Sequence, residues 1–258
     1  MLQFDETTAA LLEDAYQGSD FAMRRRANFD ALGARRGETV LDLGCGNGLL
    51  TLDLSRAVGP QGQAIGIDPS AAMLDAARAR CAGRGNTRLI EAGAQALPLD
   101  DASLDRAVSL QVFEYFNDCA GPLAELHRCL RPGGRLVLGD MHFGTLAWFS
   151  DDPGRMDRMR RAWDRHVADP ALPARLPAHL HDAGFRGVEM APLTFCDTVL
   201  RPDGLARMMI HLMTAYAVQN GHVERPEAEA WAAEQGDLAR AGRFFFALTH
   251  FVCTATRR

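Results

Sequence analysis

Residues 40–48, Val-Leu-Asp-Leu-Gly-Cys-Gly-Asn-Gly, constrain the fold of this chain more than any other segment. An apolar strand runs into a turn with three alternating glycines, and a helix is expected from Leu49. Such glycines permit a sharp turn and leave peptide N–H groups open to a ligand, and the helix adds its positive dipole end. The dinucleotide fingerprint is excluded, because its third glycine would fall at Leu49. The segment predicts a cradle for a small polar cofactor, with a plain tight turn as the alternative.

An acidic residue, Asp68, follows a second expected strand over residues 64–67 and precedes Pro69. In a doubly wound sheet, an acid at this position faces the ligand crevice and can accept hydrogen bonds from both hydroxyls of a ribose. It can equally cap the helix that begins near Ser70, a role that Pro69 at the first turn also suits. Both roles stay open, because the two carboxylate oxygens can serve different donors.

Five segments, in this order and at this spacing, resemble the class I S-adenosylmethionine-dependent methyltransferases. The likeness is closest in style to the group that includes the ubiquinone and menaquinone C-methyltransferases. The segments that carry it are residues 40–48, 66–70 with 73–74, 92–98, 104–109 and 130–136. Together they cover about residues 35–140. The combination is specific for the cofactor and the fold, and it says almost nothing about the methyl acceptor.

The resemblance implies S-adenosyl-L-methionine as the cofactor. The cofactor-binding residues that it implies are Asp42, Gly44, Cys45, Gly46, Asn47, Gly48, Asp68, Pro69, Met73, Ala94, Gln95 and Leu110. The glycine loop would line the methionyl and ribose region, with Asp42 below it, and Asp68 would bind the ribose hydroxyls. Pro69 and Met73 would flank the adenine, with Ala94 and Gln95 at its edge, and the Leu110 carbonyl would accept from the methionyl ammonium. The chain departs from the family at Gly93, where an acid often receives the adenine amino group.

Three residues are candidates for catalysis. A sulfonium methyl is already activated, so the protein mainly aligns the reactants and keeps water out. His142 is the first candidate for a general base, because it follows the strand expected over residues 135–140 and imidazole titrates near neutral pH. The alternative for His142 is an ordinary loop histidine. Glu114 and Tyr115 follow the strand expected over residues 106–110, where each either orients the acceptor or begins a helix. The side chains that could wall the acceptor pocket are Tyr16, Phe21, Trp148, His211 and Tyr216.

Helices and strands alternate along the chain. Strands are expected over residues 39–43, 64–67, 87–91, 106–110, 135–140, 187–199 and 244–255, and helices over 7–16, 19–32, 49–58, 71–82, within 113–130, and over 148–168, 174–183 and 203–220. This alternation predicts an α/β fold with a Rossmann-like, doubly wound, mostly parallel sheet. The resemblance adds a final antiparallel strand. We expect one domain, residues 1–258: an N-terminal helical lid (1–33), a cofactor-binding core (34–140), and acceptor-side helices with the last strands (141–258), the helical insertion completing the lid.

Composition narrows the functional classes. All 28 basic residues are arginine, yet the net charge is −5, so no overall basic field favours nucleic acid. The sequence has no run of 18 apolar residues and no signal-like start, and its six cysteines form no C-x-x-C pair. These features predict a cytoplasmic protein without a membrane span. No histidine and carboxylate set has metal-ligand spacing, so no metal is expected. A monomer or homodimer is expected.

Three functions fit these observations. The favoured one is methyl transfer from S-adenosylmethionine to a small, apolar or aromatic metabolite, such as a quinone, a polyketide or another secondary metabolite. The second is methyl transfer to a protein or RNA, and the third is a non-catalytic S-adenosylmethionine-binding protein. Residues 109–112, Ser-Leu-Gln-Val, lack the Asn/Asp-Pro-Pro-Tyr/Phe motif, which disfavours amino-methylation of bases. The atom that receives the methyl group, C, O, N or S, stays open.

Overall fold

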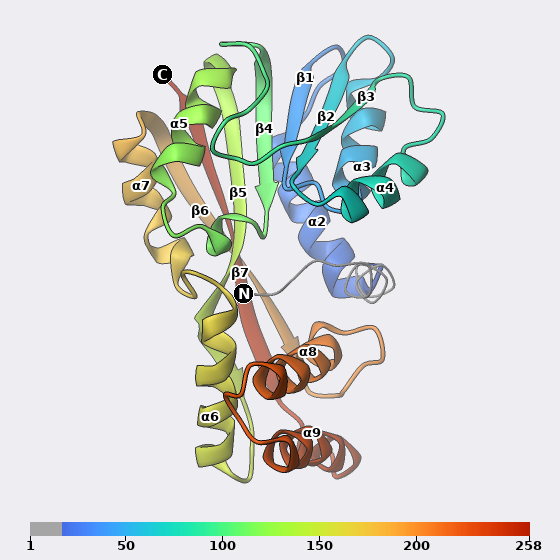
Figure 1. Cartoon of the computed structure of the whole chain (residues 1–258), viewed down its shortest axis with the longest axis vertical. Coiled ribbons are helices and arrows are strands. Elements are labelled where there is room, and N and C mark those ends of the chain that lie inside the picture. Colours follow the sequence, from blue (N-terminus) through green and yellow to red (C-terminus); the bar gives the residue numbers. More distant parts are fainter. Residues whose placement is uncertain (1–16) are drawn as a thin grey trace.

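A seven-stranded sheet forms the centre of the computed structural model, which describes residues 17–258 (Figure 1). Its strands are β1 (Thr39–Leu43), β2 (Gln63–Asp68), β3 (Thr87–Glu91), β4 (Leu104–Leu110), β5 (Leu130–Trp148), β6 (Phe185–Asp197) and β7 (Phe246–Arg257). The helices are α2 (Ser19–Leu32), α3 (Leu49–Val58), α4 (Ala71–Arg80), α5 (Ala120–Cys129), α6 (Pro153–Trp163), α7 (Leu176–Asp182), α8 (Leu205–Gln219) and α9 (Arg225–Arg240). The helix expected over residues 7–16 lies outside the described residues.

The strands lie in the order β3-β2-β1-β4-β5-β7-β6. β1 to β5 pair in parallel, whereas β7 runs antiparallel to both of its neighbours, β5 and β6. The predicted doubly wound, mostly parallel sheet with an antiparallel last strand is therefore confirmed. Parallel strands bring their carboxyl ends to one edge of the sheet, which is where ligands bind in folds of this kind.

Both faces of the sheet are covered by helices. Successive side chains of a strand point to opposite faces, and Val40 and Leu41 illustrate this on β1. Val40 packs in the apolar cluster formed with α2 and α3, and Leu41 packs in the cluster formed with α5 and α7. Because both faces are buried, the inner strands are apolar on both sides, as parallel strands usually are.

Strand β5 extends beyond the expected end at Asp140 and runs to Trp148. The helix expected over residues 148–168 is therefore wrong at its start. Trp148 pairs with Phe246 of β7 and packs its indole ring edge-on against that residue and against Trp231, which keeps it in the sheet. Helix α6 begins only after Asp152, whose side chain caps it by accepting the Arg155 N–H at 2.9 Å.

A third apolar cluster joins the far ends of β5 and β7 to α6, α8 and α9. Its buried members include Phe143, Met159, Trp163, Trp231 and Phe246. Figure 1 shows these three helices at the end of the molecule toward which β1 and β4 point. Helix α9 was not predicted from the sequence. No helix within residues 17–258 is both long enough and apolar enough to cross a membrane.

An ion-pair network ties α2 to this helical region. The buried Asp20 carboxylate accepts hydrogen bonds from Arg201 at 2.7 Å to both oxygens and from the Leu205 N–H at 2.7 Å. Arg201 also donates to Asp197 of β6 at 2.8 Å. The first turn of α2 is thereby attached to the end of β6 and to the start of α8.

Candidate active site

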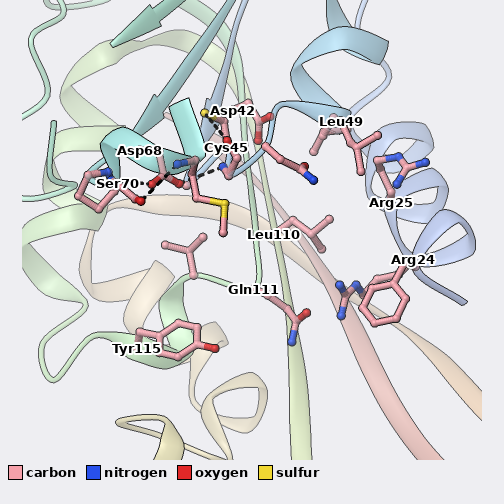
Figure 2. Close-up of a pocket in the computed structure, with 18 of the residues that line it drawn as sticks. Arg24, Arg25, Asp42, Cys45, Leu49, Asp68, Ser70, Leu110, Gln111 and Tyr115 are labelled. Carbon is pink, nitrogen blue, oxygen red and sulfur yellow. Dashed lines mark hydrogen bonds between the residues drawn. The ribbon is translucent and has the colours of Figure 1, made fainter. Parts of the chain in front are cut away.

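A cavity of about 310 Å³ lies at the carboxyl ends of β1, β2 and β4, beside α2 (Figure 2). Its volume is in the range of small-molecule sites, about 300–1,000 Å³. The cavity is lined by Phe21, Arg24, Arg25, Asp42, Gly44, Cys45, Gly46, Asn47, Leu49, Leu50, Asp68, Pro69, Ser70, Met73, Leu110, Gln111, Val112, Tyr115 and Phe116. Most of the residues that the sequence implicated in cofactor binding are in this set.

Glycine is needed at each of the three loop positions for a different local reason, although all three residues have positive φ. A Cβ on Gly44 would lie 2.2 Å from a methyl group of Val112, and one on Gly48 would lie 2.8 Å from the Cβ of Ala77. Glycine at these two positions is required by packing inside the protein. A Cβ on Gly46 would meet nothing within 4 Å, so this residue presents its backbone to the open cavity. Gly46 is therefore the glycine that a ligand could approach closely.

Asp68 braces the cavity wall through both carboxylate oxygens. Oδ2 accepts the Gly46 N–H at 2.9 Å, and Oδ1 accepts the Ser70 N–H at 2.9 Å. The cap of α4 is Ser70, whose hydroxyl accepts the Met73 N–H at 3.3 Å, so Asp68 does not cap this helix itself. Burial raises the pKa of Asp68, and the two backbone N–H groups oppose that rise. Each carboxylate oxygen has a further lone pair for a ligand hydroxyl.

Asp42 lies below the glycine loop and is almost completely buried. Its Oδ2 accepts the Thr51 hydroxyl at 2.6 Å. Burial raises the pKa of Asp42 to about 7, and repulsion from Asp68 adds to this effect. A cationic group bound in the cavity would favour the ionised form of Asp42.

Gly48, Ala94 and Gln95 lie outside the lining of the cavity, unlike the other implied cofactor-binding residues. Ala94 packs in the apolar cluster on the α5 side of the sheet. Gln95 lies against α5, where a Cβ on Gly121 would come within 2.0 Å of its Oε1. Val112 and Phe116, from the segment after β4, instead form part of the apolar wall.

His142 is also outside the lining of the cavity. Alternation along β5 turns Gly139 toward α2, where an added Cβ would lie 2.1 Å from Oδ1 of Asn28. His142 lies on the other face, where its ring is tilted against that of Phe251 with centroids 6.1 Å apart and its Nδ1 accepts the Gly144 N–H at 3.1 Å. This position does not favour the expected general base.

The other two catalytic candidates occupy different environments. Tyr115 lines the cavity, whereas Glu114 is completely buried behind it. The Glu114 backbone N–H donates to Oδ1 of Asp140, another fully buried carboxyl, at 3.3 Å. Burial and the Asp140 charge raise the pKa of Glu114 to about 8, while Arg24 opposes the rise. Burial raises the pKa of Asp140 to about 7.

Several lining residues were not predicted. On α2, Arg24 and Arg25 follow Phe21 at the i+3 and i+4 spacing that marks one helix face, and Phe21 was expected to wall the acceptor pocket. Gln111, Val112 and Phe116 follow β4, so their place after a strand end was the available signal. Tyr16 is outside the described residues. Trp148 and Tyr216 pack in or against the third apolar cluster, and His211 is exposed.

Comparison with known proteins adds the family. Residues 41–138 match the methyltransferase domain family. Over 126 residues, 49% of this chain and 52% of the relative, the chain is 36% identical to demethylmenaquinone methyltransferase of Staphylococcus aureus. Residues 41–138 therefore form an S-adenosylmethionine-dependent methyltransferase domain. The predicted resemblance to class I methyltransferases, and to their quinone-methylating group, is thereby confirmed.

Two further similarities extend beyond this methyltransferase domain. The chain is 36% identical over 233 residues, 88% of its length and 64% of the relative's, to an uncharacterized 37.1 kDa protein in transposon Tn4556 of Streptomyces fradiae. The chain thus spans between half and two thirds of the length of these curated relatives. Geranyl diphosphate C-methyltransferase from Streptomyces coelicolor shares the fold, with a TM-score of 0.56 and 18% identity over 92% of this chain and 76% of that one.

The cavity fits S-adenosylmethionine in three respects. Gly46 presents unshielded backbone, Asp68 retains lone pairs, and the buried Asp42 carboxyl would be stabilised in its ionised form by a nearby cation. Apolar side chains that include Met73 and Phe116 complete the wall. Within residues 17–258, histidine, cysteine and acidic side chains form no group of three that could hold a metal ion.

Proposed function

We propose that the methyltransferase domain transfers the methyl group of S-adenosylmethionine to a small, apolar or aromatic metabolite, such as a quinone, a polyketide or another secondary metabolite. The observation that carries this proposal is a single cavity that joins the glycine loop to a wall containing Phe21, Leu110, Val112, Tyr115 and Phe116. A wall of this composition suits an apolar or aromatic ring. The names of two similar proteins, demethylmenaquinone methyltransferase and geranyl diphosphate C-methyltransferase, also refer to small acceptors.

In this proposal the chain binds the cofactor through groups at the carboxyl edge of the sheet. Asp68 would accept the two ribose hydroxyls, the Leu110 carbonyl would accept from the methionyl ammonium, and the region near Met73 would hold the adenine. Asp42 would compensate positive charge from beneath the glycine loop. S-adenosylmethionine supplies an activated sulfonium methyl, so the remaining task of the chain is alignment and exclusion of water.

The catalytic contribution of individual side chains is then modest. Tyr115 borders the cavity and would orient the acceptor through its ring or its hydroxyl. His142 is outside the lining of the cavity and its ring packs against Phe251, so we propose that transfer proceeds without a histidine base. Positioning alone can account for a large part of such a rate enhancement, because well-oriented reactants have effective molarities of about 10⁵–10⁸ M.

Label transfer tests this function. The purified protein is incubated with methyl-labelled S-adenosylmethionine and either a panel of quinols, phenols and aromatic polyketides or the protein and RNA fractions of a bacterial lysate. We expect label in the organic-extractable small molecules, and no label with a Gly46→Val variant.

Two results would overturn the proposal. Label in the protein or RNA fraction would identify a macromolecular acceptor. Tight binding of S-adenosylmethionine without any transfer would identify a non-catalytic binding protein.

A further inference from the structure

Gln111 occupies an unusual backbone conformation at the cavity. Its φ of 55° makes it one of two non-glycine residues with positive φ among residues 17–258. Its N–H donates to the Gly139 carbonyl at 2.7 Å, which fixes the turn after β4. Figure 2 shows the Gln111 side chain in the cavity, on the side away from Asp68. Residues other than glycine rarely adopt a positive φ without a constraint, and such residues often lie at functional positions.

The amide of Gln111 is anchored from behind by Glu114. Gln111 Nε2 donates to Glu114 Oε1 at 3.3 Å. Glu114 is itself held firmly: its N–H donates to Asp140, and its carbonyl accepts from Ala168 at 2.8 Å and from Asp169 at 3.1 Å. Its side chain is completely buried, so it cannot turn to solvent.

This contact determines which end of the amide faces the cavity. Glu114 Oε2 has no hydrogen-bond partner within the described part of the chain, so a proton on the carboxyl has room on that oxygen. Oε1 then remains an acceptor whether Glu114 is ionised or protonated. Asp140 and Arg24 are the charged groups that act on Glu114, and in the hydrogen bonds described Gln111 Nε2 donates to Glu114 rather than to Asp140.

We propose that Glu114 is a positioning residue that holds the side-chain carbonyl oxygen of Gln111 toward the cavity. Gln111 then selects methyl-acceptor molecules that carry a hydrogen-bond donor, a hydroxyl or an N–H, on an otherwise apolar ring. The inference rests on the proposed small-molecule function and deepens it. In a wall that is mostly apolar, an amide oxygen left without a donor is penalised when the ligand displaces water. A methyl-acceptor molecule whose hydroxyl is replaced by a methyl ether would leave the Gln111 amide oxygen without a hydrogen-bond donor.

A matched pair of probes tests this assignment by binding alone. 1-Naphthol and 1-methoxynaphthalene differ in the donor, and each is titrated by calorimetry into the protein saturated with S-adenosylhomocysteine. We expect the wild type to bind 1-naphthol about tenfold more tightly than the ether, as one hydrogen bond of about 1.4 kcal/mol gives. Gln111→Leu should abolish this preference. Glu114→Gln should abolish or reverse it, because the new amide can donate to Gln111 Oε1.

The control is Glu227→Gln, which changes a carboxylate to an amide at an ion pair with Arg158 on the outer helices and should keep the full preference. Equal stabilisation of every variant by S-adenosylhomocysteine verifies an intact cofactor site. The proposal is overturned if the wild type shows no preference or binds neither probe, or if either Gln111→Leu or Glu114→Gln retains the preference. Label transfer is scored separately, so a preference without transfer contradicts the proposed function and leaves the Gln111 contact standing.

Discussion

At the scale of single residues, Asp68 serves the protein and the proposed ligand at once. Its oxygens hold the Gly46 loop and the turn before α4, and the same oxygens border the cavity. The sequence suggested a ribose contact or a helix cap. In the structure Asp68 does not cap α4; instead it accepts hydrogen bonds from Gly46 and Ser70 and so joins two segments that line the cavity. Loss of the carboxylate therefore affects the glycine loop as well as the predicted ribose contact.

Asp68→Ala should weaken binding of S-adenosylhomocysteine at least tenfold. Two charge-assisted acceptors are lost, at about 2–3 kcal/mol, and the Gly46 N–H loses its partner. Isothermal titration calorimetry measures the change. Asp75→Ala, which removes an exposed α4 carboxylate paired with Arg78, is the matched control and should leave the affinity unchanged. Wild-type affinity in a folded Asp68→Ala protein would remove the ribose assignment.

Gly46→Val should abolish cofactor binding while the protein remains folded. The new side chain would enter the cavity, since nothing else lies within 4 Å of the added Cβ. Gly37→Val is the matched control, because Gly37 also has positive φ and open space but lies away from the cavity. Both variants accept backbone strain of about 1–2 kcal/mol. Thermal stabilisation by S-adenosylhomocysteine should disappear only in Gly46→Val; stabilisation of wild-type size there would contradict the site.

His142→Ala should lower methyl transfer by less than about tenfold, because the imidazole packs against Phe251 and is outside the lining of the cavity. Initial rates over pH 6–9 with an acceptor found by label transfer measure the effect. Tyr115→Ala, which removes a cavity-lining ring, should have the larger effect on KM. A loss of 100-fold or more in His142→Ala, together with loss of a pH-dependent rise, would restore the histidine base.

The sequence predicted site residues best where the backbone determines their position. Asp42 and Asp68 could be placed because parallel strands bring their ends to one edge. Gln95 could not, because its side chain direction depends on how the loop after β3 packs against α5. The position of His142 could not be predicted for a related reason: the continued pairing of β5 with β7 makes it a strand residue that packs against Phe251.

At the scale of elements, α2 connects the cofactor cavity to the helices beyond the sheet. Its side chains Phe21, Arg24 and Arg25 line the cavity, and its first turn carries the Asp20–Arg201 pair. Movement of α2 relative to α8 would therefore change the cavity wall. The element order was largely predictable, since strand and helix periodicities are local. The extension of β5 and the presence of α9 depend on contacts among Trp148, Trp231 and Phe246 that bring distant segments together.

Arg201→Met should destabilise the protein by about 3–5 kcal/mol, because the buried Asp20 and Asp197 carboxylates both lose their cation. It should also weaken binding of S-adenosylhomocysteine through the loosened α2. Urea unfolding and calorimetry measure the two effects. Arg225→Met, at an exposed pair with Glu229, should change stability by less than about 1 kcal/mol. Equal stability of Arg201→Met and Arg225→Met would show that the network does not fasten α2.

At the scale of the whole molecule, buried carboxyls make stability depend on pH. Glu114 has a pKa of about 8 in the folded chain against 4.5 for an ordinary glutamate. The contribution of the protonated Glu114 to the free energy of unfolding is fully present below about pH 4.5 and is lost as pH rises through about 8. The Glu114→Gln protein should therefore gain stability relative to the wild type as pH increases over this window. Urea unfolding across pH 5–9 measures the difference, and parallel pH profiles would contradict the raised pKa.

The position of β7 has a consequence for the synthesis of this chain. Among residues 17–258, β6 pairs only with β7, and β7 is formed by residues 246–257, later in the chain than every helix described here. A ribosome making the protein exposes β1 to β5 first, and these local parallel units can begin to assemble. Until β7 emerges and inserts between β5 and β6, β6 has both edges unpaired and β5 has one edge unpaired. Nascent chains stalled before residue 246 should therefore recruit chaperones that full-length chains release.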